Sequence, residues 1–181
     1  MKLKDLRLAL SATPKKTDIR NAYLNGLNIT KTHVTGSNGH VLCHINTHAN
    51  DIPDDNIIIP METIKALLNK TGFKHEYEEV SVFLINSQYQ LQCIGYVEVF
   101  TPMEHKYPDF KKIIDTIKLN DHVKNLNSIC HQFDWSYVAL ANAAICNYFG
   151  NTVPKVLCSF EMAGYFMPNE NIIYVIMPGK V

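Results

Sequence analysis

Three stretches of the chain carry apolar residues at the three-to-four-residue spacing of an amphipathic α-helix. We predict helices from Lys2 to Ser11, from Met61 to Thr71 and from Phe133 to Phe149. Pro60 suits the start of the second helix because a missing N–H costs nothing in the first turn, and Gly72 suits its end. The apolar positions are Leu3, Leu6 and Leu10, then Ile64, Leu67 and Leu68, then Val138, Ala141, Ile145 and Phe149.

Strands are predicted where apolar and polar residues alternate, or where β-branched residues form short runs. The stretch from Ile19 to Leu42 reads as two strands joined by a tight turn at Gly36-Ser37-Asn38-Gly39, whose glycines tolerate positive φ. The second of these strands continues to Ile45. Residues 116–132 read as a connector, part of which has helical spacing. The other predicted strands are 56–59, 78–85, 89–94, 96–100, 156–160 and 172–177.

Three motifs stand out along this pattern. The first joins Arg20, Tyr23, Leu24, Asn25 and Gly26 to the turn Ser37-Asn38-Gly39-His40-Val41-Leu42. The second is Tyr107-Pro108-Asp109-Phe110-Lys111-Lys112-Ile113-Ile114. The third, Tyr174-Val175-Ile176-Met177-Pro178-Gly179-Lys180-Val181, stands at the end of the sequence. In this order the motifs resemble those of the bacterial DNA polymerase III β sliding clamps, which tether the polymerase to DNA.

The resemblance implies an α+β, DNA-clamp-like fold, in which a helix followed by a small antiparallel sheet is repeated about three times. Residues 1–117 would resemble the middle clamp domain. Residues 118–181 would resemble only the C-terminal half of the last clamp domain. The first clamp domain and half of the third have no counterpart in this sequence.

The resemblance also implies a pocket that takes peptides from polymerases and repair proteins. Apolar side chains would supply affinity, and a flexible methionine would adapt to the ligand. The alternative is that these apolar residues are ordinary core, as most Leu, Val and Met at such spacing are. The implied pocket residues are Leu24, Ser37, Gly39, His40, Val41, Leu42, Pro60, Ile64, Val175, Met177 and Pro178.

The sequence departs from the clamp motifs at three positions. Val41 stands where clamps have arginine, Asn38 where they have aspartate and Gly179 where they have methionine. The arginine would supply a polar contact and the methionine part of the pocket wall. Their replacement predicts a different partner motif or weaker peptide binding.

Charge gives limited support for DNA binding. The formal net charge is zero, which argues against a protein that grips nucleic acid by bulk charge. A local excess of basic residues nevertheless lies near the start of the sequence, where a solvated helix face is the alternative interpretation. The third predicted helix offers no basic residue. The candidate DNA-facing residues on the first two helices are Lys2, Lys4, Arg7, Lys65 and Lys70.

No enzyme, metal or cofactor site is predicted. Cys43 and His44 would point to opposite faces of a strand, and adjacent Cys130 and His131 would seldom face each other. The sequence has no glycine-rich phosphate or dinucleotide motif. Five cysteines without a CxxC pair predict reduced thiols in a cytoplasmic protein, and no stretch predicts a membrane span.

Two hypotheses of different class follow. The first is a replication processivity factor that binds polymerase or repair-protein peptides and encircles double-stranded DNA as a homo-oligomer; four such chains would supply as many halves as a clamp ring has. The second is a non-ring interaction protein that keeps the pocket and competes for clamp-binding peptides. An enzyme on the same fold is a third reading, with no substrate class to support it.

Overall fold

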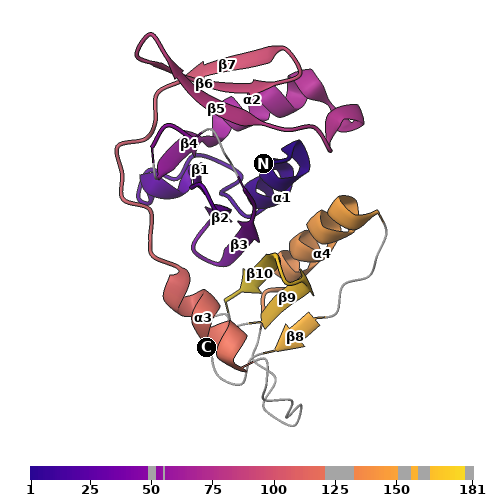
Figure 1. The fold of residues 1–181 in the computed structure, drawn as a ribbon. Helices are drawn as coiled ribbons and strands as arrows, with labels where there is room; N and C mark the ends of the chain where they lie inside the picture. The colour runs from indigo at the N-terminus through magenta and orange to yellow at the C-terminus, as the bar shows by residue number, and fades with distance from the viewer. Residues whose placement is uncertain (49–51, 55, 121–132, 151–155, 159–163, 178–181) are drawn as a thin grey trace.

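The computed structural model describes residues 1–48, 52–54, 56–120, 133–150, 156–158 and 164–177 (Figure 1). The predicted helices are confirmed as α1 (Leu3–Ser11), α2 (Met61–Thr71) and α4 (Trp135–Phe149). A further helix, α3 (Lys111–Asn120), begins inside the second motif, earlier than the predicted connector. The apolar positions that suggested helix in that connector, Val123, Leu126 and Ile129, lie outside the described residues.

The described strands form two antiparallel sheets. One has seven strands in the order β4-β1-β2-β3-β10-β9-β8, and the other has three in the order β5-β6-β7. The strand bounds are β1 Gly26–Ile29, β2 His33–Ser37, β3 Val41–Asn46, β4 Ile57–Pro60, β5 Ser81–Ile85, β6 Gln88–Cys93, β7 Tyr96–Phe100, β8 Val156–Cys158, β9 Gly164–Asn169 and β10 Ile172–Ile176. The sequence pattern did not predict β9.

The prediction of two strands between Ile19 and Leu42 is wrong. The chain forms a short 3-10 helix at Ala22–Leu24 and then the three strands β1, β2 and β3. The Thr30 hydroxyl oxygen ends β1, because it accepts hydrogen bonds from the backbone N–H groups of Thr32 and His33 at 3.2 and 3.1 Å. Such side-chain bonds compete with the strand ladder and turn the backbone.

The seven-stranded sheet connects segments that are far apart in the sequence. β3 pairs with β10, so that a strand from residues 1–117 lies beside a strand from residues 118–181. Helix α4 also packs against α1. The Tyr148 hydroxyl of α4 donates a hydrogen bond to the buried Asp5 carboxylate of α1 at 2.8 Å. The pairing of β3 with β10 and the packing of α4 on α1 thus both connect residues 1–117 with residues 118–181, which the sequence assigned to separate units.

Strand alternation gives the seven-stranded sheet two different faces. Val41 and Cys43 of β3 and Tyr174 of β10 face the main core, where α1 and α4 pack. Leu42 and Val175 point to the opposite face, which we call the outer face. The second motif and the start of α3 cover part of this outer face (Figure 1). Within the described residues, no helix is both long and apolar enough to cross a membrane.

Candidate peptide-binding site

The first and third motifs meet through the pairing of β3 with β10. Leu42 and Val175 are direct partners in this ladder. One step beyond it, the backbone N–H of Met177 donates a hydrogen bond to the carbonyl oxygen of His40 at 2.8 Å. The end of β10 is therefore fixed beside the turn that precedes β3, although the two segments lie far apart in the sequence.

The second motif crosses the outer face and joins two apolar clusters. Phe110 packs against a cluster that contains Leu42 and Val175, and also against a cluster that contains Leu24. Ile113 and Met177 pack against the first of these clusters. All three sequence motifs thus contribute to one surface, which we call the apolar patch: Leu24, Leu42, Phe110, Ile113, Val175 and Met177.

The apolar patch has a buried floor and an accessible rim. Leu24, Leu42 and Val175 form the floor, with at most 3% of each residue exposed. Phe110, Ile113 and Met177 are half-buried and form the rim. A buried apolar floor with partly exposed aromatic, branched and flexible side chains above it suits the anchoring of an apolar peptide side chain.

The turn between β2 and β3 is fixed by its own polar groups. The Ser37 hydroxyl donates to the Val41 carbonyl oxygen at 2.7 Å and accepts from the Gly39 N–H at 3.1 Å. The Asn38 side-chain oxygen accepts from the N–H groups of His40 and Val41, both at 2.9 Å. Gly39 has φ of 86°, which glycine adopts without strain. These bonds hold His40 at the surface next to the apolar patch.

Helix α4 supplies a polar and aromatic flank that the sequence analysis did not assign to the site. The ring of Tyr137 stacks on His40, with 5.4 Å between centroids and 15° between planes. Asp134 caps the helix by accepting a hydrogen bond from the Ser136 N–H at 2.8 Å. This bonding to Ser136 lowers the pKa of Asp134, and the charge of His40 lowers it further. The sequence signal for this flank is Asp134 itself, because aspartate is a preferred N-cap residue and stands at the start of the apolar spacing of α4.

Not every predicted pocket residue is brought to the apolar patch. Val41 and Ile64 are buried in the main core, at 1% and 0% exposure. Val41 faces the core because it alternates with Leu42 along β3. Pro60 is half-buried at the start of α2 and pairs with Gly26 in the β1–β4 ladder. Pro178 lies outside the described residues.

Ile64 of α2 was predicted to line the pocket. In the structure, the second motif forms that part of the wall. In the sequence, Tyr107-Pro108-Asp109 contributed to the resemblance and was not assigned to the pocket. Tyr107 is in fact 5% exposed and packs with Leu24 and Ile58, and burial raises the pKa of its phenol. The motif can line the patch because α3 begins within it, at Lys111, and turns Ile113 and Ile114 toward the sheet.

The candidate DNA-facing cations of α1 are engaged by aromatic rings. The Lys4 ammonium lies over the rings of Tyr77 and Tyr148, 4.6 and 4.2 Å from their centroids. The Arg7 guanidinium lies 3.9 Å from the centroid of the Phe73 ring and donates to the Gly72 carbonyl oxygen at 3.2 Å. Burial lowers the pKa of Arg7, and the carboxylate of Glu76 partly opposes that shift. Lys2 is exposed.

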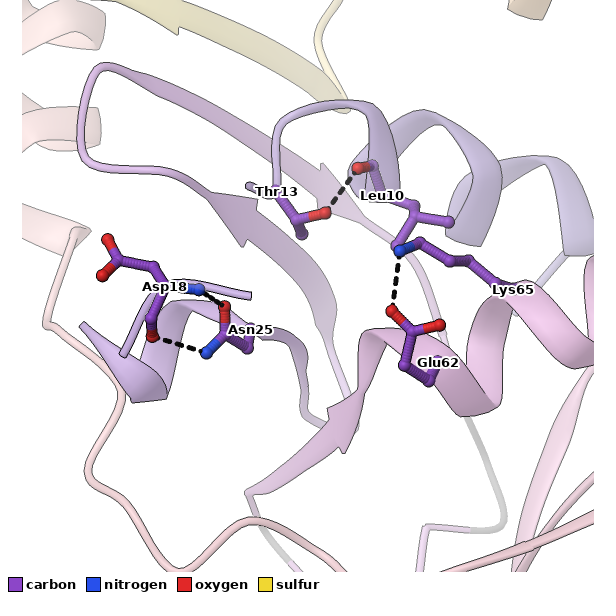
Figure 2. Close-up of polar contacts among 6 residues, drawn as sticks. All are labelled: Leu10, Thr13, Asp18, Asn25, Glu62 and Lys65. Atoms are coloured by element: carbon purple, nitrogen blue, oxygen red, sulfur yellow. Dashed lines mark hydrogen bonds and ion pairs between the residues drawn. The ribbon is translucent and has the colours of Figure 1, made fainter. Parts of the chain in front are cut away.

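The candidate cations of α2 are paired with carboxylates. Lys65 Nζ lies 2.8 Å from a carboxylate oxygen of Glu62, one turn earlier on the same helix (Figure 2). Lys70 Nζ lies 2.6 Å from Glu98 of β7. In each pair the carboxylate partly offsets the positive charge of its lysine. Among the described residues, no group of three or more His, Cys, Asp and Glu is placed to hold a metal ion.

No protein-family model matches this chain, and a search of curated proteins finds no match either. Solved structures, in contrast, match it over its whole length. The sliding clamp of Pseudomonas aeruginosa is 15% identical, with a TM-score of 0.64, and 100% of this chain aligns with 66% of that protein. The DNA polymerase III β subunit of Borrelia burgdorferi, solved with a natural product, is 13% identical with a TM-score of 0.69 over 100% and 63% of the two chains.

A third match, the Bartonella birtlesii sliding clamp bound to griselimycin, is 16% identical with a TM-score of 0.65, over 100% of this chain and 65% of that one. The chain therefore spans just under two thirds of the length of these clamps. Its fold is a shortened sliding-clamp fold, and the predicted α+β, clamp-like architecture is confirmed.

Proposed function

We propose that this chain, with its shortened sliding-clamp fold, is a non-enzymatic, clamp-like factor of DNA replication or repair. It binds peptide segments of polymerases or repair proteins at the apolar patch, in the cytoplasm. The observation that carries this proposal is the meeting of three distant motifs on one surface, with Phe110, Ile113 and Met177 half-exposed around a buried floor.

The geometry favours a peptide with an apolar anchor and a neighbouring aromatic or polar residue. The anchor packs on Met177 and Ile113, where the thioether chain adjusts to its shape. The adjacent residue reaches the stacked rings of His40 and Tyr137, with the Asp134 carboxylate nearby. A partner segment with a basic or aromatic residue beside its anchor fits this flank best.

The proposal is tested by titrating a fluorescent peptide from a clamp-binding polymerase tail into the protein. Met177→Ala should weaken binding about 5- to 30-fold, the loss expected when an interface anchor of about 1–2 kcal/mol is truncated. Ile94→Ala provides the control, because Ile94 is 45% exposed in the β6–β7 turn, outside the patch. Absence of wild-type binding, or equal affinity of Met177→Ala and wild type, would overturn the proposal.

A second candidate function is the encirclement of double-stranded DNA. It is favoured by a cavity of about 320 Å³ between α1, α2 and α4, lined by Arg7, Lys15 and Lys65 among others. Cations on helices, as Arg7 and Lys65 are, can meet phosphates without reading base sequence. Two observations oppose this function: aromatic side chains cover Lys4 and Arg7, and carboxylates pair with Lys65 and Lys70. We therefore favour the peptide-binding competitor over the ring.

Duplex binding measured at two salt concentrations separates the two candidates. A DNA clamp should retain duplex at low salt and lose it steeply as salt rises, because released counterions drive such binding. A peptide-binding competitor should show little duplex binding at either concentration while its affinity for the polymerase-tail peptide persists.

A further inference from the structure

The outer face of the seven-stranded sheet carries three buried polar side chains side by side. Successive cross-strand partners from β4 through β1, β2 and β3 to β10 are Ile58, Asn28, Thr35, His44 and Ile173. The side chains of direct partners lie on the same face of a sheet. Asn28, Thr35 and His44, which we call the polar row, are therefore flanked by isoleucines, and each is at most 9% exposed. Buried polar groups are unfavourable unless they find hydrogen-bond partners.

The protein satisfies only part of the polar row. The Thr35 hydroxyl oxygen lies 2.9 Å from His44 Nδ1, and His44 Nε2 lies 3.2 Å from Asn46 Oδ1. The buried Asn28 Oδ1, in contrast, has no hydrogen-bond partner among the described residues. A buried acceptor without a partner destabilises a fold, so a role other than stability is indicated for Asn28.

A cavity of about 650 Å³ lies over the polar row. One side of it is formed by the strands, and the other by the segment from Lys106 to Asp115, which contains the second motif and the start of α3. The ring of His33 lies beside that of His44, with 4.8 Å between centroids. Phe110 lines both this cavity and the apolar patch. The volume is in the range of pockets that hold small organic molecules.

The strand side of the cavity suits an uncharged group that has both hydrogen-bond donors and acceptors. Among the described residues that line this side there is no lysine, arginine, aspartate or glutamate. Burial lowers the pKa of His33, which keeps its ring neutral near pH 7. A bare phosphate or carboxylate would lose its hydration here without gaining an opposite charge. An apolar ligand would leave the polar row unpaired.

A nucleobase fits this side of the cavity. Its edge is uncharged and presents donors next to acceptors, and a carboxamide such as that of Asn28 pairs with an adenine edge through both of its polar atoms. Rotation about the last side-chain bond of Asn28, which is a soft torsion, turns the unpaired oxygen toward such a ligand.

The mouth of the cavity carries charges of both signs. Lys106 and Lys111 are exposed there, as are Asp109 and Asp115. The Lys111 N–H donates a hydrogen bond to Asp109 Oδ1 at 3.0 Å, which fixes this carboxylate at the start of α3. Lysines bind phosphate, and carboxylates accept hydrogen bonds from ribose hydroxyls. A nucleotide therefore uses the charges at the mouth as well as the neutral polar row.

We propose that this cavity binds a nucleoside monophosphate, with its base at the polar row and its phosphate at Lys106 and Lys111. The site differs from the apolar patch, although Phe110 and Ile114 border both. Nucleotide binding here goes beyond the proposed function and requires no peptide. The same chemistry is offered by a free nucleotide and by the phosphorylated terminal nucleotide of a single strand, and the experiment separates these two sources.

The experiment titrates adenosine monophosphate (AMP) into the protein, with the affinity measured by calorimetry and the histidine ring signals followed by NMR. AMP should shift the signals of His33 and His44 but not those of His75, which does not line the cavity. Inorganic phosphate should bind at least about tenfold more weakly than AMP, because it cannot use the polar row. A phosphorylated tetranucleotide is then added to the AMP complex. Displacement of AMP supports the site with a strand end as its source, and retention of AMP supports it with a free nucleotide.

Asn28→Leu tests the polar row, because it removes the amide and keeps a side chain of similar size beside Ile58. It should weaken AMP binding at least about tenfold. Its urea midpoint should equal or exceed that of wild type, because an apolar side chain replaces an unpaired acceptor. Thr35→Val, which keeps the side-chain shape, repeats the binding test where Asn28→Leu does not fold.

Lys111→Ala tests the phosphate position and should weaken AMP binding about threefold or more. Lys112→Ala is its matched control, since Lys112 is the next residue of α3 and does not line the cavity. The proposal is overturned if wild type binds no AMP up to about 10 mM, if phosphate binds as tightly as AMP, or if a folded variant of the polar row keeps wild-type affinity. Equal losses in Lys111→Ala and Lys112→Ala overturn it as well.

Discussion

The Met177 N–H donates a hydrogen bond to the His40 carbonyl oxygen at 2.8 Å. This bond extends the β3–β10 ladder past its last strand pair and fixes the register of Val175 against Leu42. Register decides which side chains reach the outer face, because a slip of one residue would exchange the patch residues of β10 for core residues. The candidate site therefore depends on how β10 pairs as well as on which residues it carries.

Phe110 should be the residue whose loss most disturbs the apolar patch, because it packs against both of its clusters. Phe110→Ala should lower the free energy of unfolding by about 2 kcal/mol, less than a fully buried phenylalanine loses. Urea unfolding followed by circular dichroism measures this as a lower midpoint with an unchanged slope. Phe73→Ala, at a 67% exposed position, should cost less than half as much; equal losses would contradict the role assigned to Phe110.

Gly36 permits the close approach of α1 to β2. A Cβ at this position would lie 2.1 Å from the Ala9 carbonyl oxygen, a backbone atom that can move only with its helix. Gly36→Ala should therefore destabilise the protein by about 3 kcal/mol. Gly95→Ala is the comparison, since nothing lies within 4 Å of its added methyl group. Only the positive φ of 75° is unfavourable for alanine, and it should lower the free energy of unfolding by about 1–2 kcal/mol. Thermal unfolding should rank the two variants in this order, and the reverse order would contradict the contact.

The hydrogen bond from Tyr148 to Asp5 joins α4 to α1. Tyr148→Phe leaves one oxygen of a carboxylate that is 4% exposed without its partner, which should cost about 1–3 kcal/mol. Tyr77→Phe, at a 62% exposed residue, should stay within about 0.5 kcal/mol of wild type. Both values come from urea titrations, and a neutral Tyr148→Phe variant would show that this bond does not hold α4 in place.

Alkaline pH should destabilise the fold through its buried tyrosines. Burial raises the pKa of Tyr107, Tyr148 and Tyr174 above the ordinary value of 10.0. The unfolded chain then loses these protons first, so the stabilisation is complete below pH 10 and falls as the pH rises beyond it. Unfolding free energies measured on both sides of pH 10 should decline, and Tyr107→Phe should decline less steeply. A wild-type slope in that variant would contradict the assignment.

Local sequence determined most of the elements. Apolar spacing predicts α1, α2 and α4 at or within two residues of their observed bounds. The proline before α2 and the glycine after it predict the two ends of that helix. Alternation predicts β7 and most of β5, β6 and β10. These features follow from the sequence because capping, turn chemistry and amphipathic spacing act over a few residues.

The tertiary structure decided which residues form the site. Leu42 and Val41 are neighbours of similar hydrophobicity, yet only Leu42 joins the apolar patch, because the other face of β3 is covered by α1. Phe110 and Ile113 join it because α3 starts at Lys111 and turns back onto the sheet. A local pattern does not determine these contacts, because they depend on strand register and on packing between segments that are distant in the sequence.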